Sequence, residues 1–268
     1  MFTNKFFVID QNHLSYPKHG LESFILKSSP DVYFVITDYA FLEMVKPLDM
    51  DKNIEKTLQI IKKYSNRIWH ANSANKLTTK EIKKKKAVQL HDIIEVEMRG
   101  RLRYFLVGYK QKGNDSPAYK EVKTAKSIIV PKLKDNILDE KLGYKVLYEM
   151  HTFLDNNVIR KRNGVVNRFQ NCKLNNEDLL SFVKAVILFE TDILNNLKFT
   201  KDEIDKFIIQ DTCVFRWLCA LALLALQLRS QGIENFHEDK SPNELLDIDY
   251  TVIASYGQGL LSDDQKLN

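Results

Sequence analysis

The strongest constraint on the fold is a pair of short apolar runs near the N-terminus, each of which ends abruptly in polar residues. Residues 6–9 (Phe-Phe-Val-Ile) lead directly into Asp10, and residues 32–37 (Val-Tyr-Phe-Val-Ile-Thr) lead into Asp38. Short runs rich in β-branched and aromatic residues are typical of strands buried on both faces of a parallel sheet. They predict an α/β fold with a central, mostly parallel sheet.

The C-terminal end repeats this arrangement. Residues 259–261 predict a short strand, and three polar residues follow it directly: Ser262, Asp263 and Asp264. In parallel α/β sheets, ligands bind outside the carboxyl ends of the strands. Acids in these positions are therefore expected to converge on one site with Asp10.

Two predicted helices supply further acids. Glu43 lies in the opening turns of a helix that Thr37 or Asp38 can cap, and the helix predicted before the last strand carries Asp247 and Asp249. Taken singly, Glu43 and Asp247 would serve equally well as acids that complement a helix dipole. Four acids in such positions together favour a shared site.

Asp10 fits the helix-cap explanation less well, because the Gln-Asn pair after it predicts no helix. It is therefore the acid for which a functional role is most strongly indicated.

At these positions the chain resembles the PIN-domain nucleases, including the VapC-like toxins. Residues 9–12 (Ile-Asp-Gln-Asn) resemble the strand-Asp-x-Asn opening of that family, and Thr37 followed six residues later by Glu43 resembles its helix start. Residues 261–267 resemble its last acidic motif, which selects Asp264. The resemblance covers about the first fifty and last thirty residues of the chain.

The third acid is open between two residues. The family places it at the start of the helix before the last motif, where Asp247 and Asp249 both qualify. We prefer Asp247 because Tyr250 and Ala254 follow it along one helix face. Asp249 and Asp263 remain reserve candidates.

The resemblance implies a PIN-like three-layer fold and a metal-dependent nuclease. Carboxylate oxygens are the ligands that Mg²⁺ and Mn²⁺ prefer, and the ion would neutralise phosphate charge and lower the pKa of a bound water. The implied ligands are Asp10, Glu43, Asp247 and Asp264. The residues that would orient them are Asn12, Ser262 and Thr37.

RNA is the favoured substrate, because most of the resembling toxins are ribonucleases, and a toxin or antiviral defence role follows by the same analogy. The alternative is a PIN-like module that binds nucleic acid or protein without cleaving it. A regulatory, antitoxin-like protein and a second copy of the chain are further candidate partners.

About two hundred residues separate the second and third acids, whereas small PIN domains have a few dozen there. We therefore expect a split catalytic core, 1–48 and 235–268, with a mainly helical insertion over 49–234. Periodic apolar residues predict amphipathic helices over 54–69 and 179–197. The apolar fraction of 44% is ample for a packed core.

One segment, Cys213 to Leu228, resembles a membrane span, but it is short for one and contains Arg216. We expect it to be a buried core helix within about 205–232, and we expect no membrane partner.

Basic residues gather in three segments that would bind phosphates and give a salt-sensitive grip on nucleic acid. They are Lys83, Lys84, Lys85 and Lys86; Arg99, Arg101 and Arg103; and Arg160, Lys161 and Arg162, with Arg168 nearby. The second group lies in residues 93–109, whose alternation predicts a strand. A lysine run by itself is more often a solvated helix face, and only its coupling to the acids favours nucleic acid.

Other features exclude several classes of site. The 9 glycines form no phosphate-cradling loop or nucleophile elbow, and the histidines show no metal-binding spacing. The three cysteines, Cys172, Cys213 and Cys219, form no metal-ligand pattern and cannot all pair, which favours a reducing compartment. With no evident signal peptide, we expect a cytoplasmic protein.

Overall fold

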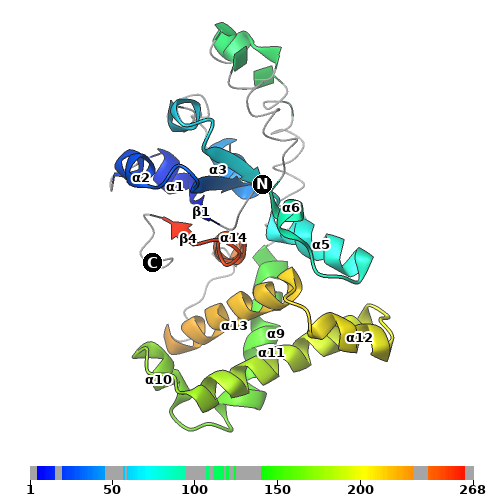
Figure 1. Ribbon diagram of the computed structural model, residues 1–268. Helices are drawn as coiled ribbons and strands as arrows, with labels where there is room; N and C mark the ends of the chain where they lie inside the picture. Colours follow the sequence, from blue (N-terminus) through cyan, green and yellow to red (C-terminus); the bar gives the residue numbers. More distant parts are fainter. Residues whose placement is uncertain are drawn as a thin grey trace. The chain divides into compact units, whose positions relative to one another are not determined.

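The structure is a computed structural model (Figure 1). It describes residues 5–15, 20–45, 57, 59–94, 107–108, 111–117, 119–120, 124, 140–231 and 241–262. The chain divides into two compact units. The sheet unit comprises Met1–Leu77, Gln89–Leu133 and Asp249–Asn268, and the helical unit comprises Thr78–Val88 and Lys134–Ile248.

Four short parallel strands form the sheet, in the order β3-β2-β1-β4 (Figure 1). They are β1 Phe6–Ile9, β2 Tyr33–Thr37, β3 Ile68–Ala71 and β4 Gly259–Leu261. Val8 at the centre of β1 is fully buried and pairs with Val35 on one side and Leu260 on the other. The predicted α/β class with a parallel sheet is confirmed, and the architecture is compatible with a three-layer α/β fold.

Short helices follow the strands in the sheet unit. They are α1 Gln11–Ser15, α2 Leu21–Lys27, α3 Asp38–Val45 and α6 Leu90–Ile93. Gly20 precedes α2 with φ 78°, a left-handed conformation that favours glycine. Thr37 accepts a hydrogen bond from the Ala40 N–H at 3.4 Å, as expected of a residue that caps α3.

The predicted helix over 54–69 is wrong at its C-terminal end, where β3 begins. The described residues are helical at 57 and 59–63 and turn at 64–67, and Ile68 and Trp69 belong to the strand. Arg67 holds the turn by donating hydrogen bonds to backbone carbonyls of residues 25, 28, 29 and 32. Pairing with β2 decides the conformation of this segment, against its helical period.

The domain boundaries also differ from those expected. β3 lies inside the range 49–234 that we assigned to the insertion, yet it is a strand of the core sheet. Helix α5, Ala74–Lys84, begins in the sheet unit and ends in the helical unit. A few apolar residues near position 68 carry no signal of a distant strand partner, so the sequence places the boundary too early.

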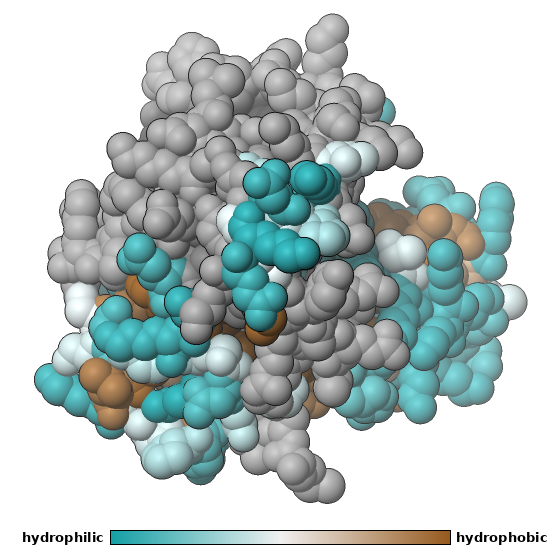
Figure 2. Space-filling view, turned by 90° about the horizontal axis from the view of Figure 1, so that it is seen from above, coloured by the Kyte–Doolittle hydropathy of each residue, from teal (hydrophilic) through white to brown (hydrophobic). Residues whose placement is uncertain are grey.

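Among the described residues, the helical unit comprises the C-terminal part of α5, the N-terminal part of α14 (Ser241–Ala254), and five α-helices with a short π-helical segment. They are α9 Glu140–Leu154, η2 Asp155–Ile159, α10 Val165–Gln170, α11 Asn176–Asn196, α12 Lys201–Ile208 and α13 Cys213–Gln231. Asn175 and Thr200 cap α11 and α12, each in a reciprocal pair with an acid three residues later. In the view of Figure 2, hydrophobic residues at the described surface form small patches among hydrophilic ones.

The range 205–232, where we expected one core helix, contains parts of two helices. Residues 209–212 are not helical and separate α12 from α13. α13 packs against α9, α10 and α11. Among the described residues it is the one helix long and apolar enough to cross a membrane, and half of that stretch is buried within the protein. A core helix of a soluble protein passes the same test, so this is weak evidence for a span.

Candidate functional site

The connections of the sheet reverse direction at β1. The chain runs from β1 to β2 and then β3 on one side, and it returns through α14, Ser241–Ala254, to β4 on the other side. In open parallel sheets the crevice outside the carboxyl ends of the strands at such a reversal is the usual ligand site. Here the carboxyl ends of β1 and β4 meet, with Ile9 paired to Leu261.

Asp10 lies at this reversal and is only 3% exposed. Its Oδ2 accepts a hydrogen bond from the Ser262 hydroxyl at 2.8 Å, and its backbone N–H donates to the Leu261 carbonyl at 3.0 Å. Ser262, which we named among the residues that would orient the acids, thus contacts Asp10. Residues 263 and 264, with the candidates Asp263 and Asp264, lie outside the described residues.

Asp10 also precedes a helix, contrary to our expectation that none follows it. α1 begins at Gln11, and Asp10 Oδ1 accepts the Asn12 backbone N–H at 3.4 Å. The helix is one short turn and a half, which gives almost no periodic signal in the sequence. Asn12 thus contacts Asp10 through its backbone, so one carboxylate oxygen serves as a cap and the other faces β4.

Glu43 meets a tyrosine from the C-terminal helix. The Tyr250 hydroxyl donates to Glu43 Oε2 at 2.5 Å, across 207 residues of sequence. Tyr250 is 1% exposed, and burial together with the negative charges of Glu43, Asp10 and Asp249 raises its pKa well above the usual value. Three of the candidate acids therefore act electrostatically on one buried phenol.

Asp249 is buried and caps helix α5. Its Oδ1 accepts the Ala74 backbone N–H, and its Oδ2 has no hydrogen-bond partner among the described residues. Burial and then the charge of Asp38 raise the pKa of Asp249 well above the usual value. The group is therefore held in its neutral form far more readily than an exposed aspartate. Asp247, half-exposed, lies one turn before Tyr250 on the same face of α14.

Asp38 and His70 form a pair at the ends of β2 and β3. His70 Nε2 lies 2.9 Å from Asp38 Oδ1, and Asp38 Oδ2 accepts the Ser73 N–H at 3.0 Å. Burial would raise the pKa of Asp38, but these two hydrogen bonds and the His70 charge outweigh it and lower the pKa. Sequence reasoning missed His70 because no ligand spacing marks it, and only the strand order brings it to Asp38.

The described side chains meet the chemistry of a magnesium site only in part. Carboxylate oxygens are suitable ligands, and the unpartnered Asp249 Oδ2 is a suitable buried acceptor. Within the described residues, however, no three Asp, Glu, His or Cys side chains lie close enough together to hold a metal ion. Asp10, Glu43 and Asp249 are gathered at one edge without forming a complete ligand set.

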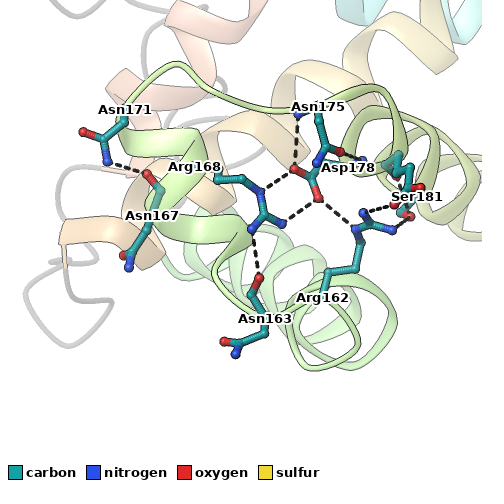
Figure 3. Close-up of polar contacts among 9 residues, drawn as sticks. Arg162, Asn163, Asn167, Arg168, Asn171, Asn175, Asp178 and Ser181 are labelled. Atoms are coloured by element: carbon teal, nitrogen blue, oxygen red, sulfur yellow. Dashed lines mark hydrogen bonds and ion pairs between the residues drawn. The ribbon is translucent and has the colours of Figure 1, made fainter.

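The third basic segment is occupied by internal ion pairs (Figure 3). Arg162 and Arg168 both donate to the buried Asp178 of α11, at 2.7 to 2.8 Å. The Arg168 hydrogen bonds, with those of Arg162, hold the pKa of Asp178 well below its usual range despite its desolvation. Arg162 also binds Glu177 and Ser181. Its guanidinium is therefore committed within the fold, which argues against its predicted role in phosphate binding.

The other predicted phosphate-binding residues differ in their surroundings. Arg160 pairs with Asp155 at 2.7 Å, and Lys161 Nζ donates to Asn157 at 3.5 Å. Lys83, Lys84, Lys85 and Lys86 are exposed at the end of α5. Arg99, Arg101 and Arg103 lie outside the described residues, as does most of the strand predicted over 93–109. Val107 and Gly108 within that range are helical.

Comparison with protein-family models, curated proteins and solved structures finds no match for this chain. The carboxyl edge of the sheet is the candidate site on the evidence of its own geometry.

Proposed function

We propose that this protein is a metal-dependent nuclease with a PIN-like core and a mainly helical insertion, and that RNA is its favoured substrate. The observation that carries the proposal is the placement of Asp10 against Ser262 at the reversal between β1 and β4. Glu43 and Asp249 are gathered around Tyr250 at the same edge. The resemblance of these acids to the PIN motifs supplies the reaction class.

In this proposal, the described residues orient the carboxylates. Ser262 fixes one oxygen of Asp10 and Tyr250 fixes one oxygen of Glu43, so neither carboxylate has to reorganise when it takes up a ligand. Asp264 and either Asp247 or Asp249 would complete the ligand set. When bound, Mg²⁺ or Mn²⁺ would neutralise phosphate charge and acidify a water.

The remaining expectations about cellular context are proposals of the same kind. Cys172, Cys213 and Cys219 are all free thiols, which supports a reducing, cytoplasmic setting. A toxin or antiviral role, a regulatory protein partner and self-association rest on the family resemblance alone.

A cleavage assay tests the enzyme. Labelled RNA, single-stranded DNA and duplex DNA are incubated with the protein in Mg²⁺, in Mn²⁺ and in chelator, beside the Asp10→Asn variant. Asp31→Asn is the matched control, since Asp31 precedes β2 at the opposite end of the strands and pairs with Lys5. We expect metal-dependent cleavage that Asp10→Asn abolishes and Asp31→Asn retains.

The competing function is a module that binds RNA or a protein partner without cleaving. RNA binding with no cleavage in any metal would establish this alternative, and equal loss of cleavage in both variants would contradict a specific role for Asp10.

A further inference from the structure

The lysine run at the end of α5 is anchored to a second basic segment in the helical unit. Lys85 Nζ lies 2.7 Å from Glu203 Oε1 of α12 and 4.9 Å from the centre of the Phe199 ring. The Ala87 backbone N–H donates to Gln210 Oε1 at 2.9 Å. These contacts bring residues 83–87 against the turn between α11 and α12, more than one hundred residues later in the chain.

Five lysines are exposed on the two joined segments: Lys83, Lys84, Lys86, Lys198 and Lys201. Among the described residues, no hydrogen bond or ion pair occupies the ammonium group of any of them. The neighbouring acids are mostly neutralised, because Glu203 pairs with Lys85 and Asp202 pairs with Lys206 at 2.7 Å. The surface therefore carries a strong local excess of positive charge, which we call the lysine patch.

We propose that the lysine patch binds the phosphate backbone of a nucleic acid. Compact ammonium groups on flexible stems suit a repeating polyanion without base recognition, since each contact releases condensed counterions. The inference rests on the proposed function for its choice of a nucleic acid as the polyanion.

An anionic membrane fits this surface less well. Helices that lie in a lipid surface add a continuous apolar face to their electrostatic attraction. Of the apolar residues of α12, Ile204 and Phe207 are buried and Ile208 is half-buried, and its exposed face carries Asp202 and Asp205 among the lysines. Leu197, 46% exposed before α12, and Ile209, 84% exposed after it, are separate side chains.

The test measures binding apart from cleavage. Fluorescence anisotropy of a labelled single-stranded oligouridine is recorded with the full chain in chelator, over a series of salt concentrations. The variant is Lys198→Asn with Lys201→Ala, because Lys198 has φ 64° and asparagine tolerates this left-handed conformation. The matched control is Lys173→Ala with Lys184→Ala, two exposed lysines of the same unit.

We expect the patch variant to reduce the slope of log K against log salt by about 1.4, at about 0.7 for each phosphate contact on a single strand. Lys198→Arg with Lys201→Arg should retain the slope, and the control should change it little. An equal change in the control would show that net charge alone drives binding. Preferential binding to phosphatidylserine vesicles with no affinity for RNA would also overturn the proposal.

The two proposals fail separately. Asp10→Asn should bind oligouridine like the wild type, because its binding is measured without metal. Patch-dependent binding with no cleavage in any metal would remove the nuclease and leave this inference standing. If cleavage depends on Asp10 but the slope of log K against log salt is the same in the Lys198 and Lys201 variant as in the wild type, this inference alone is wrong.

Discussion

At the residue scale, two buried carboxylates differ in the hydrogen bonds that they accept. Glu81 and Glu190 are both fully buried in the helical unit. Glu81 accepts three backbone N–H groups, from Val88, Cys213 and Val214, at 2.8 to 3.0 Å. Within the part of the chain that the structure describes, Glu190 accepts only the Thr212 hydroxyl, at 3.4 Å, and its Oε2 has no hydrogen-bond partner. Both side chains are buried, but hydrogen bonds stabilise the charged form of Glu81 much more than that of Glu190.

The Glu190→Gln substitution should flatten the pH dependence of stability. Burial, opposed by the Thr212 hydrogen bond and reinforced by the charge of Glu81, raises the pKa of Glu190 from 4.5 to about 7. Between pH 4.5 and about 7, Glu190 is ionised in the unfolded chain but still protonated in the folded protein. The free energy of unfolding therefore falls as the pH rises through this range, and the stabilisation present below pH 4.5 is lost by about pH 7. At about pH 8 the variant should be more stable than the wild type, by on the order of 2 to 3 kcal/mol.

Urea unfolding of the full chain at a series of pH values measures this effect. Glu81→Gln is the contrasting variant, because an amide nitrogen cannot accept the N–H groups that Glu81 binds, and it should destabilise the protein at every pH. Parallel pH curves for the wild type and Glu190→Gln would contradict the role given to Glu190.

The Tyr250→Phe substitution tests the contact with Glu43. Removing the hydroxyl leaves Glu43 without this donor and should cost about 1 kcal/mol in the free energy of unfolding. If Glu43 belongs to the nuclease site, cleavage should fall more than this loss of stability explains. Tyr148→Phe, at an exposed position in α9, serves as the control and should change neither quantity.

At the element scale, strand β4 depends on a close backbone approach. A Cβ at Gly257 would lie 2.4 Å from the Phe6 carbonyl oxygen and 2.7 Å from its ring. The adjacent Gln258 N–H donates to that same carbonyl at 2.7 Å. Glycine at this position is thus what allows the turn after α14 to deliver β4 against β1, and with it Ser262 against Asp10.

The Gly257→Ala substitution should therefore loosen the β1–β4 pair. We expect a loss of about 1 to 3 kcal/mol, the usual cost of overpacking, with faster amide exchange in both strands. Hydrogen exchange read by mass spectrometry locates the change, and Ser255→Ala in the same turn is the control. Unchanged exchange in β1 and β4 would refute the steric argument.

At the scale of the whole molecule, α5 is one of the two described helices, with α14, that are divided between the units. Its N-terminal part, through Leu77, belongs to the sheet unit, and its C-terminal part, from Thr78, belongs to the helical unit. Asp249 binds its first turn, while Glu81 connects it to the start of α13. Breaking this one helix should therefore affect the stability of both units.

The Thr79→Pro substitution tests this coupling. Thr79 is exposed within α5, so proline changes the helix without opening a core cavity, at a cost of about 3 kcal/mol or more. We expect hydrogen exchange to accelerate in the β strands and in α13 alike, whereas Thr79→Ala should leave both protected. Acceleration confined to one unit would show that the units are stabilised independently.

The sequence predicted several secondary-structure elements correctly, but it predicted poorly which distant segments pair with one another. The apolar runs before Asp10 and before Asp38 are strands, because burial on both faces leaves a local signature. The strand at Ile68 was missed, since its short run follows a helical pattern and its partner lies thirty residues earlier. Of the candidate acids, Asp10 contacts Ser262, one of the residues named to orient them, whereas its role as the cap of α1 was not foreseen.

The basic residues show the same limit. A cluster containing Arg162 and Arg168 resembles a phosphate-binding segment, yet Asp178 from another helix occupies both guanidinium groups. Lys83 and Lys84 resemble a solvated helix face, and contacts made in the fold, such as that of Lys85 with Glu203, join them to Lys198 and Lys201. The sequence shows where charged residues lie along the chain, but only the fold decides which of them are neutralised by a partner of opposite charge.

The sequence by itself thus determined the apolar strands at both ends of the chain, the polar residues that follow them and the amphipathic helix over 179–197. These features follow from spacing along a few consecutive residues. Only the tertiary structure decided that Tyr250 meets Glu43, that His70 meets Asp38 and that Glu190 is buried without a full set of partners. Such encounters depend on packing between distant segments, which no local pattern records.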